Sequence, residues 1–207
     1  MSQASEVLVP AARLARWVLN FGGRHGDTAF GVSGGALTGV AADGSTFRAR
    51  LPLGASYAGE PDAAGFAGVV AAPARWGVLL VRRGGFAVAR LAGETVVESK
   101  VGQRHVQGRT KAGGQSQQRF ARRRDNQARQ AFEAAADHAA RILGDSPRGT
   151  LVVTGGDRTA VDEVLADPRL SRLTVAGPWL AVPDPRRAVL EQAVRDALAV
   201  TIEVHNA

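Results

Sequence analysis

The chain has 207 residues, enough for one ordinary domain or for one domain with a small appendage. It has no cysteine, which excludes disulfides, cysteine zinc sites and thiol nucleophiles. No apolar run reaches the ~18 residues of a membrane span, and residues 1–10 lack the features of an export signal, so we expect a cytoplasmic protein without a membrane partner. A formal net charge of +7 and a pI near 11.2 favour a polyanionic partner.

Residues 1–60 predict a small N-terminal α+β element. Apolar residues recur at helical spacing over residues 8–21, and Gly22-Gly23 ends the pattern. Asp43-Gly44 is a hairpin turn between two alternating stretches, residues 37–41 and 46–51. A Gly-, Ala- and Pro-rich stretch follows, and it predicts a surface connection or domain boundary at residues 55–70.

The rest of the chain, residues 70–207, predicts an α/β domain in which helices flank a mixed β-sheet. Residues 76–82, 86–92 and 94–104 indicate an antiparallel meander of three strands. Residues 116–143 lack Gly and Pro and predict one long helix. The remainder alternates: a strand at 150–154, a helix at 159–166, a strand at 173–175 and a helix at 185–200.

Residues 109–116 predict an exposed loop between the meander and the long helix, because no apolar side chain larger than alanine is available to anchor it. The adjacent Gly113 and Gly114 allow positive φ and a close approach to another surface. Arg109 and Lys111 supply charge for phosphate contact. Such a loop suits entry into RNA.

A stripe of basic side chains follows the loop. Residues 100–130 hold nine Lys or Arg residues and a single acidic one, Asp125. Spacings of three or four residues place most of the stripe on one helix face, and the alternative, a solvated face, would normally mix charges of both signs. We therefore expect contacts to RNA from Arg119, Arg122, Arg123, Arg124, Asn126 and Arg129.

The same residues carry a family resemblance. Gly113-Gly114-Gln115-Ser116, followed by Arg119-Phe120-Ala121-Arg122, resembles the catalytic loop and following helix in the middle domain of archaeal and eukaryotic class-one release factors. In size and order of elements the chain is more similar to the Vms-like release factors, in particular the stand-alone bacterial, actinobacterial type. The resemblance implies an RNase H-like mixed sheet, a catalytic Gln115 flanked by Gly113 and Gly114, and an RNA contact from Ser116.

The resemblance also implies a ribosome-dependent peptidyl-tRNA hydrolase that frees nascent chains from stalled ribosomes or large subunits. Its partners would be peptidyl-tRNA and the rRNA of the peptidyl transferase centre, and we expect a monomer that uses no metal and no cofactor. A glutamine side chain is no general base, so it would orient water or donate a hydrogen bond while other groups move the proton. A chain of 207 residues leaves no room for separate codon-reading domains, which predicts release without a stop codon.

Two other functions stay open, a nuclease directed at tRNA and a non-catalytic module that binds the ribosome. No catalytic triad is legible, since the four histidines, His25, His105, His138 and His205, are scattered. The three tryptophans read as core residues, and Gly34-Gly35 and Gly155-Gly156 read as turns without a phosphate-binding motif. Residues 1–55 are the expected recruitment region.

Overall fold

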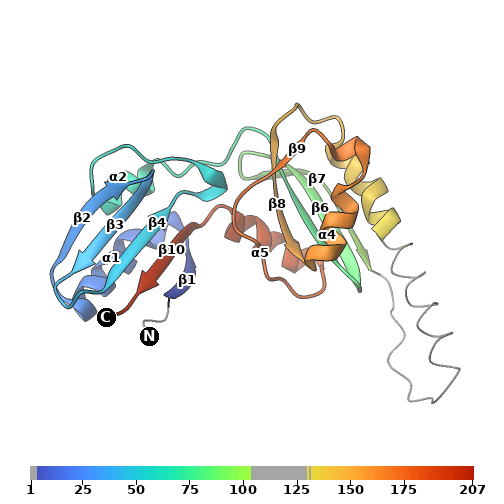
Figure 1. The fold of residues 1–207 in the computed structure, drawn as a ribbon. Coiled ribbons are helices and arrows are strands. Elements are labelled where there is room, and N and C mark those ends of the chain that lie inside the picture. Colours follow the sequence, from blue (N-terminus) through green and yellow to red (C-terminus); the bar gives the residue numbers. More distant parts are fainter. Residues whose placement is uncertain (1–3, 104–129, 131) are drawn as a thin grey trace, which may run out of the picture. The chain divides into compact units, whose positions relative to one another are not determined.

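The computed structural model describes residues 4–103, 130 and 132–207, which form two compact units (Figure 1). The first unit comprises Met1–Ala72 with Arg195–Ala207, and the second comprises Pro73–Val194. Each unit is built on a five-stranded sheet with helices, which confirms the α/β class. Among the described residues, no helix has the length and apolar character needed to cross a membrane.

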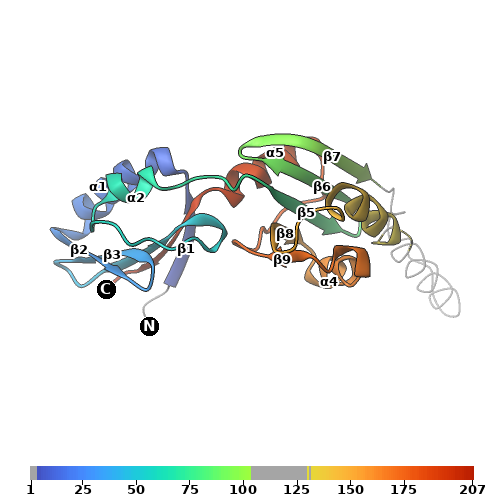
Figure 2. The same cartoon turned by 90° about the horizontal axis from the view of Figure 1, so that it is seen from above.

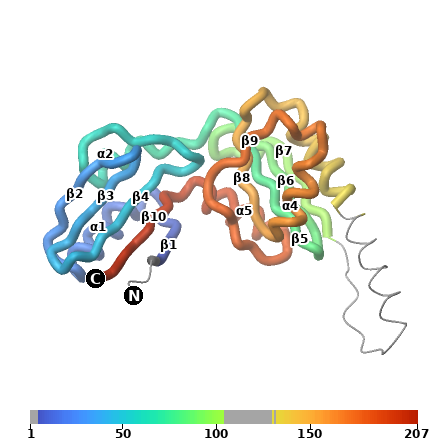
Figure 3. Tube along the Cα trace, in the orientation of Figure 1, coloured from blue at the N-terminus to red at the C-terminus, as the bar shows by residue number. Residues whose placement is uncertain are grey.

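The sheet of the first unit is antiparallel throughout and has the strand order β1-β10-β4-β3-β2. It joins the two ends of the chain, because β1 and β10 lie side by side (Figure 3). The strands are β1 (Ala4–Val9), β2 (Thr28–Ser33), β3 (Ala36–Ala41), β4 (Thr46–Arg50) and β10 (Val200–His205), and the helices are α1 (Ala11–His25), α2 (Ala63–Gly68) and the 3-10 turn η1 (Pro52–Gly54).

Helices α1 and α2 pack against one face of this sheet. Leu14 of α1 and Phe66 of α2 are fully buried in one cluster with Phe47 of β4 and Ile202 of β10. The opposite face carries charged side chains that pair with one another: Arg50 reaches Glu6 at 3.3 Å and Glu203 at 3.5 Å. One apolar and one polar face is the usual pattern of an antiparallel sheet with a single covered side.

The N-terminal prediction needs two corrections. The hairpin is confirmed as β3 and β4, with Gly44 in the left-handed region at φ 92°. The predicted helix does not begin at residue 8, because residues up to Val9 belong to β1, and α1 continues beyond residue 21 to His25. Residues 55–70 are not a plain surface connection, since Tyr57 and Phe66 are buried in the first unit and their rings meet edge to face with centroids 4.8 Å apart.

The sheet of the second unit is mixed, as predicted, with the order β7-β6-β5-β8-β9. The predicted meander is confirmed, because β5 pairs antiparallel with β6 and β6 with β7. Strands β8 and β9 add on the other side of β5 in parallel. The strands are β5 (Trp76–Arg82), β6 (Gly85–Ala92), β7 (Thr95–Gln103), β8 (Thr150–Gly156) and β9 (Leu173–Val175).

Helices cover both faces of the second sheet (Figure 2). The helix of residues 132–143 and α4 (Arg158–Leu165) share one buried cluster with Leu79 and Val81 of β5. Helix α5 (Arg187–Ala197) packs on the opposite face, where Arg187 donates to Ser99 Oγ at 3.3 Å. Because strand β5 is covered on both sides, its first six residues are all buried.

Two further corrections concern β8 and the C-terminus. Gly155 and Gly156 end β8 rather than forming a separate turn, and a Cβ on Gly155 would lie 2.4 Å from the carbonyl oxygen of Leu180. The helix predicted to residue 200 ends at Ala197, and Val200–His205 form β10 in the first sheet. The chain from Arg195 onward therefore belongs to the first unit by its contacts.

Candidate functional site

The predicted catalytic and RNA-contacting residues follow β7 and precede the helix of residues 132–143 in the chain, outside the described residues. They are Gly113, Gly114, Gln115, Arg109, Lys111, Ser116, Arg119, Arg122, Arg123, Arg124, Asn126 and Arg129. The structure defines the strand before them and the helix after them. We call these two elements the supports of the candidate site.

The net charge of the chain is concentrated between these two supports. Residues 104–129 hold eight of the 26 Lys and Arg residues and one of the 19 acidic residues. The remaining residues carry 18 basic and 18 acidic side chains, so the +7 excess of the whole chain equals the charge of this one segment. A field of one sign confined to one segment favours phosphate contact there more strongly than an evenly spread charge would.

The helix of residues 132–143 is held close to the sheet by small buried residues. Ala135 and Ala139 are fully buried, which lets the helix backbone approach the strands. Ile142 and Leu143 fill the space farther along, and His138 stacks on Phe86 of β6 with ring centroids 5.4 Å apart. The support for the preceding residues is thus a packed helix with a buried face.

Glu98 of β7 ties this helix to two strands. Its carboxylate accepts from Arg141 of the helix at 2.6 Å and from Arg90 of β6 at 3.3 Å. The hydrogen bond from Arg141, and then that from Arg90, lowers the pKa of Glu98. β7 and the helix, which lie on either side of the predicted loop in sequence, are therefore joined to each other through one carboxylate.

Arg169 joins the same helix to the end of α4. It follows α4 in the 3-10 turn η2 (Pro168–Leu170) and donates to Asp167 from both Nε, at 2.9 Å, and Nη2, at 2.6 Å. Nη2 also donates to Asp137 of the helix at 2.7 Å. The side-chain hydrogen bonds from Arg169, together with its backbone N–H, lower the pKa of Asp167 to about 2. We call Arg169, Asp137 and Asp167 the arginine clamp.

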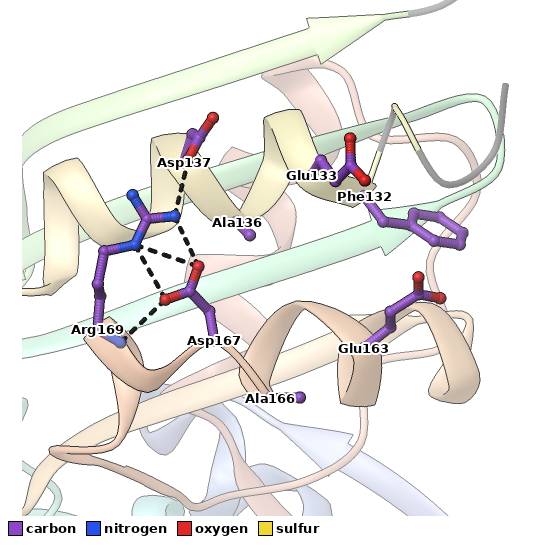
Figure 4. A pocket seen from close by; sticks show the side chains of 8 residues that line it. All are labelled: Phe132, Glu133, Ala136, Asp137, Glu163, Ala166, Asp167 and Arg169. Carbon is purple, nitrogen blue, oxygen red and sulfur yellow. Dashed lines mark hydrogen bonds and ion pairs between the residues drawn. The ribbon is translucent and has the colours of Figure 1, made fainter. Parts of the chain in front are cut away.

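A groove of about 360 Å³ lies between the helix and α4, and the arginine clamp closes one end of it (Figure 4). Its lining residues are Phe132, Glu133, Ala136, Asp137, Glu163, Ala166, Asp167 and Arg169. The lining contains four carboxylates and a single guanidinium, and within the described parts of the chain neither Glu133 nor Glu163 has an ion-pair partner. An acidic groove repels phosphate, so it disfavours RNA on this side of the helix.

Histidines and metal ligands do not gather in the described part of the chain. His25 bonds to Asp43 at 2.9 Å in the first unit, and His205 bonds to Glu203 at 3.1 Å. His138 stacks within the second unit, and His105 lies outside the described residues. Across residues 4–103, 130 and 132–207, no three His, Asp or Glu side chains form a group suited to a metal ion.

The three tryptophans are packed against the cores, as predicted, but the extent of their burial differs. Trp76 is fully buried and donates from Nε1 to the carbonyl of Gly93 at 2.8 Å. Trp17 and Trp179 are half-buried against the cores of the first and second units. A cation–π contact that sequence reasoning did not predict joins Trp179 to Arg158, whose Cζ lies 4.3 Å from the ring centroid.

In the second unit, strand β7 of a mixed sheet leads into the arginine-rich segment that contains Gly-Gly-Gln, and a packed helix follows that segment. This arrangement is that of a release-factor-like α/β protein. The family model of the Actinobacteria/chloroflexi VLRF1 release factors matches residues 74–203, and the chain belongs to this family. The match spans nearly all of the second unit and most of β10. No curated protein matches the chain.

Proposed function

We propose that the protein is a ribosome-dependent peptidyl-tRNA hydrolase that releases nascent chains from stalled ribosomes or large subunits without a stop codon. The observation that carries the proposal is the family match over residues 74–203, a range that contains Gly113-Gly114-Gln115. The concentration of the net charge in residues 104–129 supports it, because peptidyl-tRNA and rRNA are both polyanions.

Gln115 is the proposed catalytic residue. Ester hydrolysis needs an oriented water and a hydrogen-bond donor for the oxygen on which negative charge develops. The amide side chain and the backbone N–H of Gln115 offer such donors, and one well-placed donor contributes about 3–4 kcal/mol to transition-state stabilisation. Because an amide takes up no proton near neutral pH, water, RNA hydroxyls or the tRNA itself would transfer the proton. Gly113 and Gly114 would allow the backbone to approach the ester closely.

The side chains around this tripeptide are the proposed RNA contacts. A guanidinium can bind phosphate through two parallel hydrogen bonds, which suits arginine to such contacts. The proposed set is Arg109, Lys111, Ser116, Arg119, Arg122, Arg123, Arg124, Asn126 and Arg129. The acidic groove along the helix of residues 132–143 would disfavour RNA phosphates at that place.

Two parts of the chain would have different roles. The second unit, Pro73–Val194, is the proposed catalytic domain, with the proposed Gly-Gly-Gln loop at residues 109–116. Residues 1–60 form the small N-terminal element, and residues 1–55 are the proposed recruitment surface. The protein would act in the cytoplasm as a monomer, with the large subunit and peptidyl-tRNA as partners and without a cofactor.

One assay separates the candidate functions. Large ribosomal subunits that carry peptidyl-tRNA, labelled on the peptide and on the tRNA, are incubated with the protein, and the products are separated. Free peptide with intact tRNA supports the hydrolase. Cleaved tRNA would instead identify a nuclease, and binding without either product a non-catalytic module. Intact ribosomes stalled on a sense codon and on a stop codon should release peptide at similar rates.

A further inference from the structure

Three strands of the second sheet end along one edge. Strand β6 is antiparallel to both β5 and β7, and β8 is parallel to β5, so β5, β7 and β8 all point the same way. In register, Gln103 of β7 lies opposite Gly85, and Gly85 lies opposite Arg82 of β5. Val81 lies opposite Gly156 of β8. We call the edge at which β5, β7 and β8 end the carboxyl edge. The basic segment of residues 104–129 follows β7 directly in sequence.

Two consecutive arginines stand at the end of β5 on this edge and have different surroundings. The Arg82 side chain lies across the end of β8, since a Cβ on Gly156 would lie 3.0 Å from its Cγ. It donates to the carbonyl of Val182 at 2.8 Å and lies 3.6 Å from Asp184. Arg83 is exposed, and within the described parts of the chain it has no acceptor and no carboxylate partner.

A third arginine, Arg158, stands at the start of α4 on the same edge. Its guanidinium stacks over Trp179, which is placed there because Gly156 N–H donates to the carbonyl of Leu180 at 3.0 Å. Stacking fixes the guanidinium plane and leaves its N–H groups free, and no described residue accepts from them. The neighbouring carboxylate of Asp157 is occupied in capping the helix through Ala160 N–H, at 3.3 Å.

The position of Arg158 is not explained by the stability of α4. A cation in the first turn is disfavoured by the helix dipole, which places positive partial charge at that end. The unpaired guanidinium of Arg158, the helix N-terminus and Arg83 are therefore three positive groups on this edge, while its carboxylates are engaged, Asp157 with Ala160 N–H and Asp184 with Arg82. A ligand with several negative charges would offset this positive charge. A nucleic acid backbone is such a ligand, because its phosphates repeat along the strand and can span the edge.

We infer that the carboxyl edge, through Arg83 and Arg158, binds RNA phosphates and forms a second RNA contact in addition to the one proposed for residues 104–129. The identity of that RNA, rRNA of the large subunit or the bound tRNA, rests on the proposed function. The contact itself rests on the two unpaired arginines, the stacked Trp179 and the common edge. It would hold the second unit against RNA at the edge where β7 ends.

The test compares two double variants of the full chain. Arg83→Gln with Arg158→Gln removes two charges from the carboxyl edge. The control, Arg148→Gln with Arg172→Gln, removes two charges from exposed arginines at the opposite edge, where Gly149 N–H donates to the carbonyl of Arg172 at 2.8 Å. Binding to purified large subunits is titrated between about 50 and 200 mM salt, first with empty subunits and then with subunits that carry peptidyl-tRNA.

The carboxyl-edge variant should bind about tenfold more weakly near 0.1 M salt, and its salt slope should fall by about 1.4–1.8, as expected for two lost phosphate contacts. The control should stay near the parent. A loss with empty subunits identifies rRNA, and a loss that needs peptidyl-tRNA identifies tRNA. Equal losses in both double variants, or no loss in either, overturn the inference. The single variant Arg83→Gln, at an exposed turn, keeps the test decisive if the double variant unfolds.

The outcome is separable from that of the proposed function. If the parent protein binds large subunits but releases no peptide, the hydrolase proposal fails, and the comparison of the two edges remains valid as a binding measurement. Arg158→Lys adds a check on geometry, because lysine keeps the charge but loses the planar stacking on Trp179. It should bind with an affinity between those of the parent and the single variant Arg158→Gln, and a parental affinity would contradict the role of the stacked plane.

Discussion

The contact between Gly77 of β5 and Leu143 decides how closely the support helix of residues 132–143 lies on the second sheet. A Cβ on Gly77 would lie 2.8 Å from Cδ2 of Leu143 and 3.3 Å from the carbonyl oxygen of Ala89. Leu143 is only 1 % exposed and belongs to the cluster that joins the helix to β5. The position therefore requires glycine for reasons of space, and the leucine fills the space that the glycine leaves.

Two substitutions and their combination test this reading. Gly77→Ala overpacks the contact and should lower the free energy of unfolding by about 1–3 kcal/mol. Leu143→Ala leaves a cavity and should lower it by about 3–5 kcal/mol. In the double variant the new methyl group enters part of that cavity. Its loss should therefore be smaller than the sum of the two single losses, by about 1–2 kcal/mol.

The free energies can be measured by urea unfolding followed by tryptophan fluorescence in a Trp17→Phe background. The remaining tryptophans, Trp76 and Trp179, then report the second unit alone. Leu190→Ala combined with Gly77→Ala is the matched control, because the buried Leu190 lies on α5 at the other face of the sheet. The control pair should be additive. If the Gly77–Leu143 pair is also additive to within about 0.5 kcal/mol, the reasoning about this contact is refuted.

Two further predictions concern charge. Changing Arg119, Arg122 and Arg123 to Glu should weaken binding to large subunits and lower the salt slope without unfolding the protein; an unchanged slope would mean that these side chains form a solvated surface. The pKa of Asp167 lies near 2 in the folded protein, below its ordinary 3.8, so the stabilisation by Arg169 is present above about pH 4 and is lost as the pH falls toward 2. Asp167→Asn should therefore lose less stability than the parent between pH 4 and 2 in urea unfolding, and parallel losses would contradict the arginine clamp.

Elements stabilised by neighbouring residues were predictable from the sequence. The hairpin of β3 and β4 has an Asp43-Gly44 turn between alternating stretches, and the meander from β5 to β7 has glycines at its turns. Both rest on contacts within a few residues, which local patterns encode.

The first sheet was only partly predictable, because its edge depends on a contact between the two ends of the chain. Strand β1 pairs with β10, with Val9 opposite Val200. The sequence pattern of either strand does not show which strand it pairs with. Residues 200–205 do alternate, which is a strand signal, but the preceding helical pattern continued to residue 200. Phe66 is buried through a helix of six residues that begins after Asp62, which is too short for periodicity to detect.

The proposed catalytic residues rest on the tripeptide and its spacing to the arginines and stay a prediction, whereas the contacts of the elements that flank them could not be predicted. The arginine clamp joins residues 32 positions apart, and Glu98 and Arg141 lie 43 positions apart. Such pairs depend on how the helix packs on the sheet, and exposed charges of either sign give no local signal for it. The contact between Arg158 and Trp179 likewise depends on tertiary structure, because the bridge between Gly155 and Leu180 brings the two residues together.

The most direct test of the central claim is the rate of peptide release by Gln115→Ala on large subunits that carry labelled peptidyl-tRNA, with binding measured in parallel. The variant should bind as the parent does and release peptide about 10²–10³-fold more slowly, as expected for the loss of one transition-state donor. A milder loss would shift the role to the backbone N–H, which alanine keeps, and Gly114→Ala should then be the slower variant. Parental release rates in both variants, each folded and bound, would contradict a catalytic role for the Gly-Gly-Gln segment.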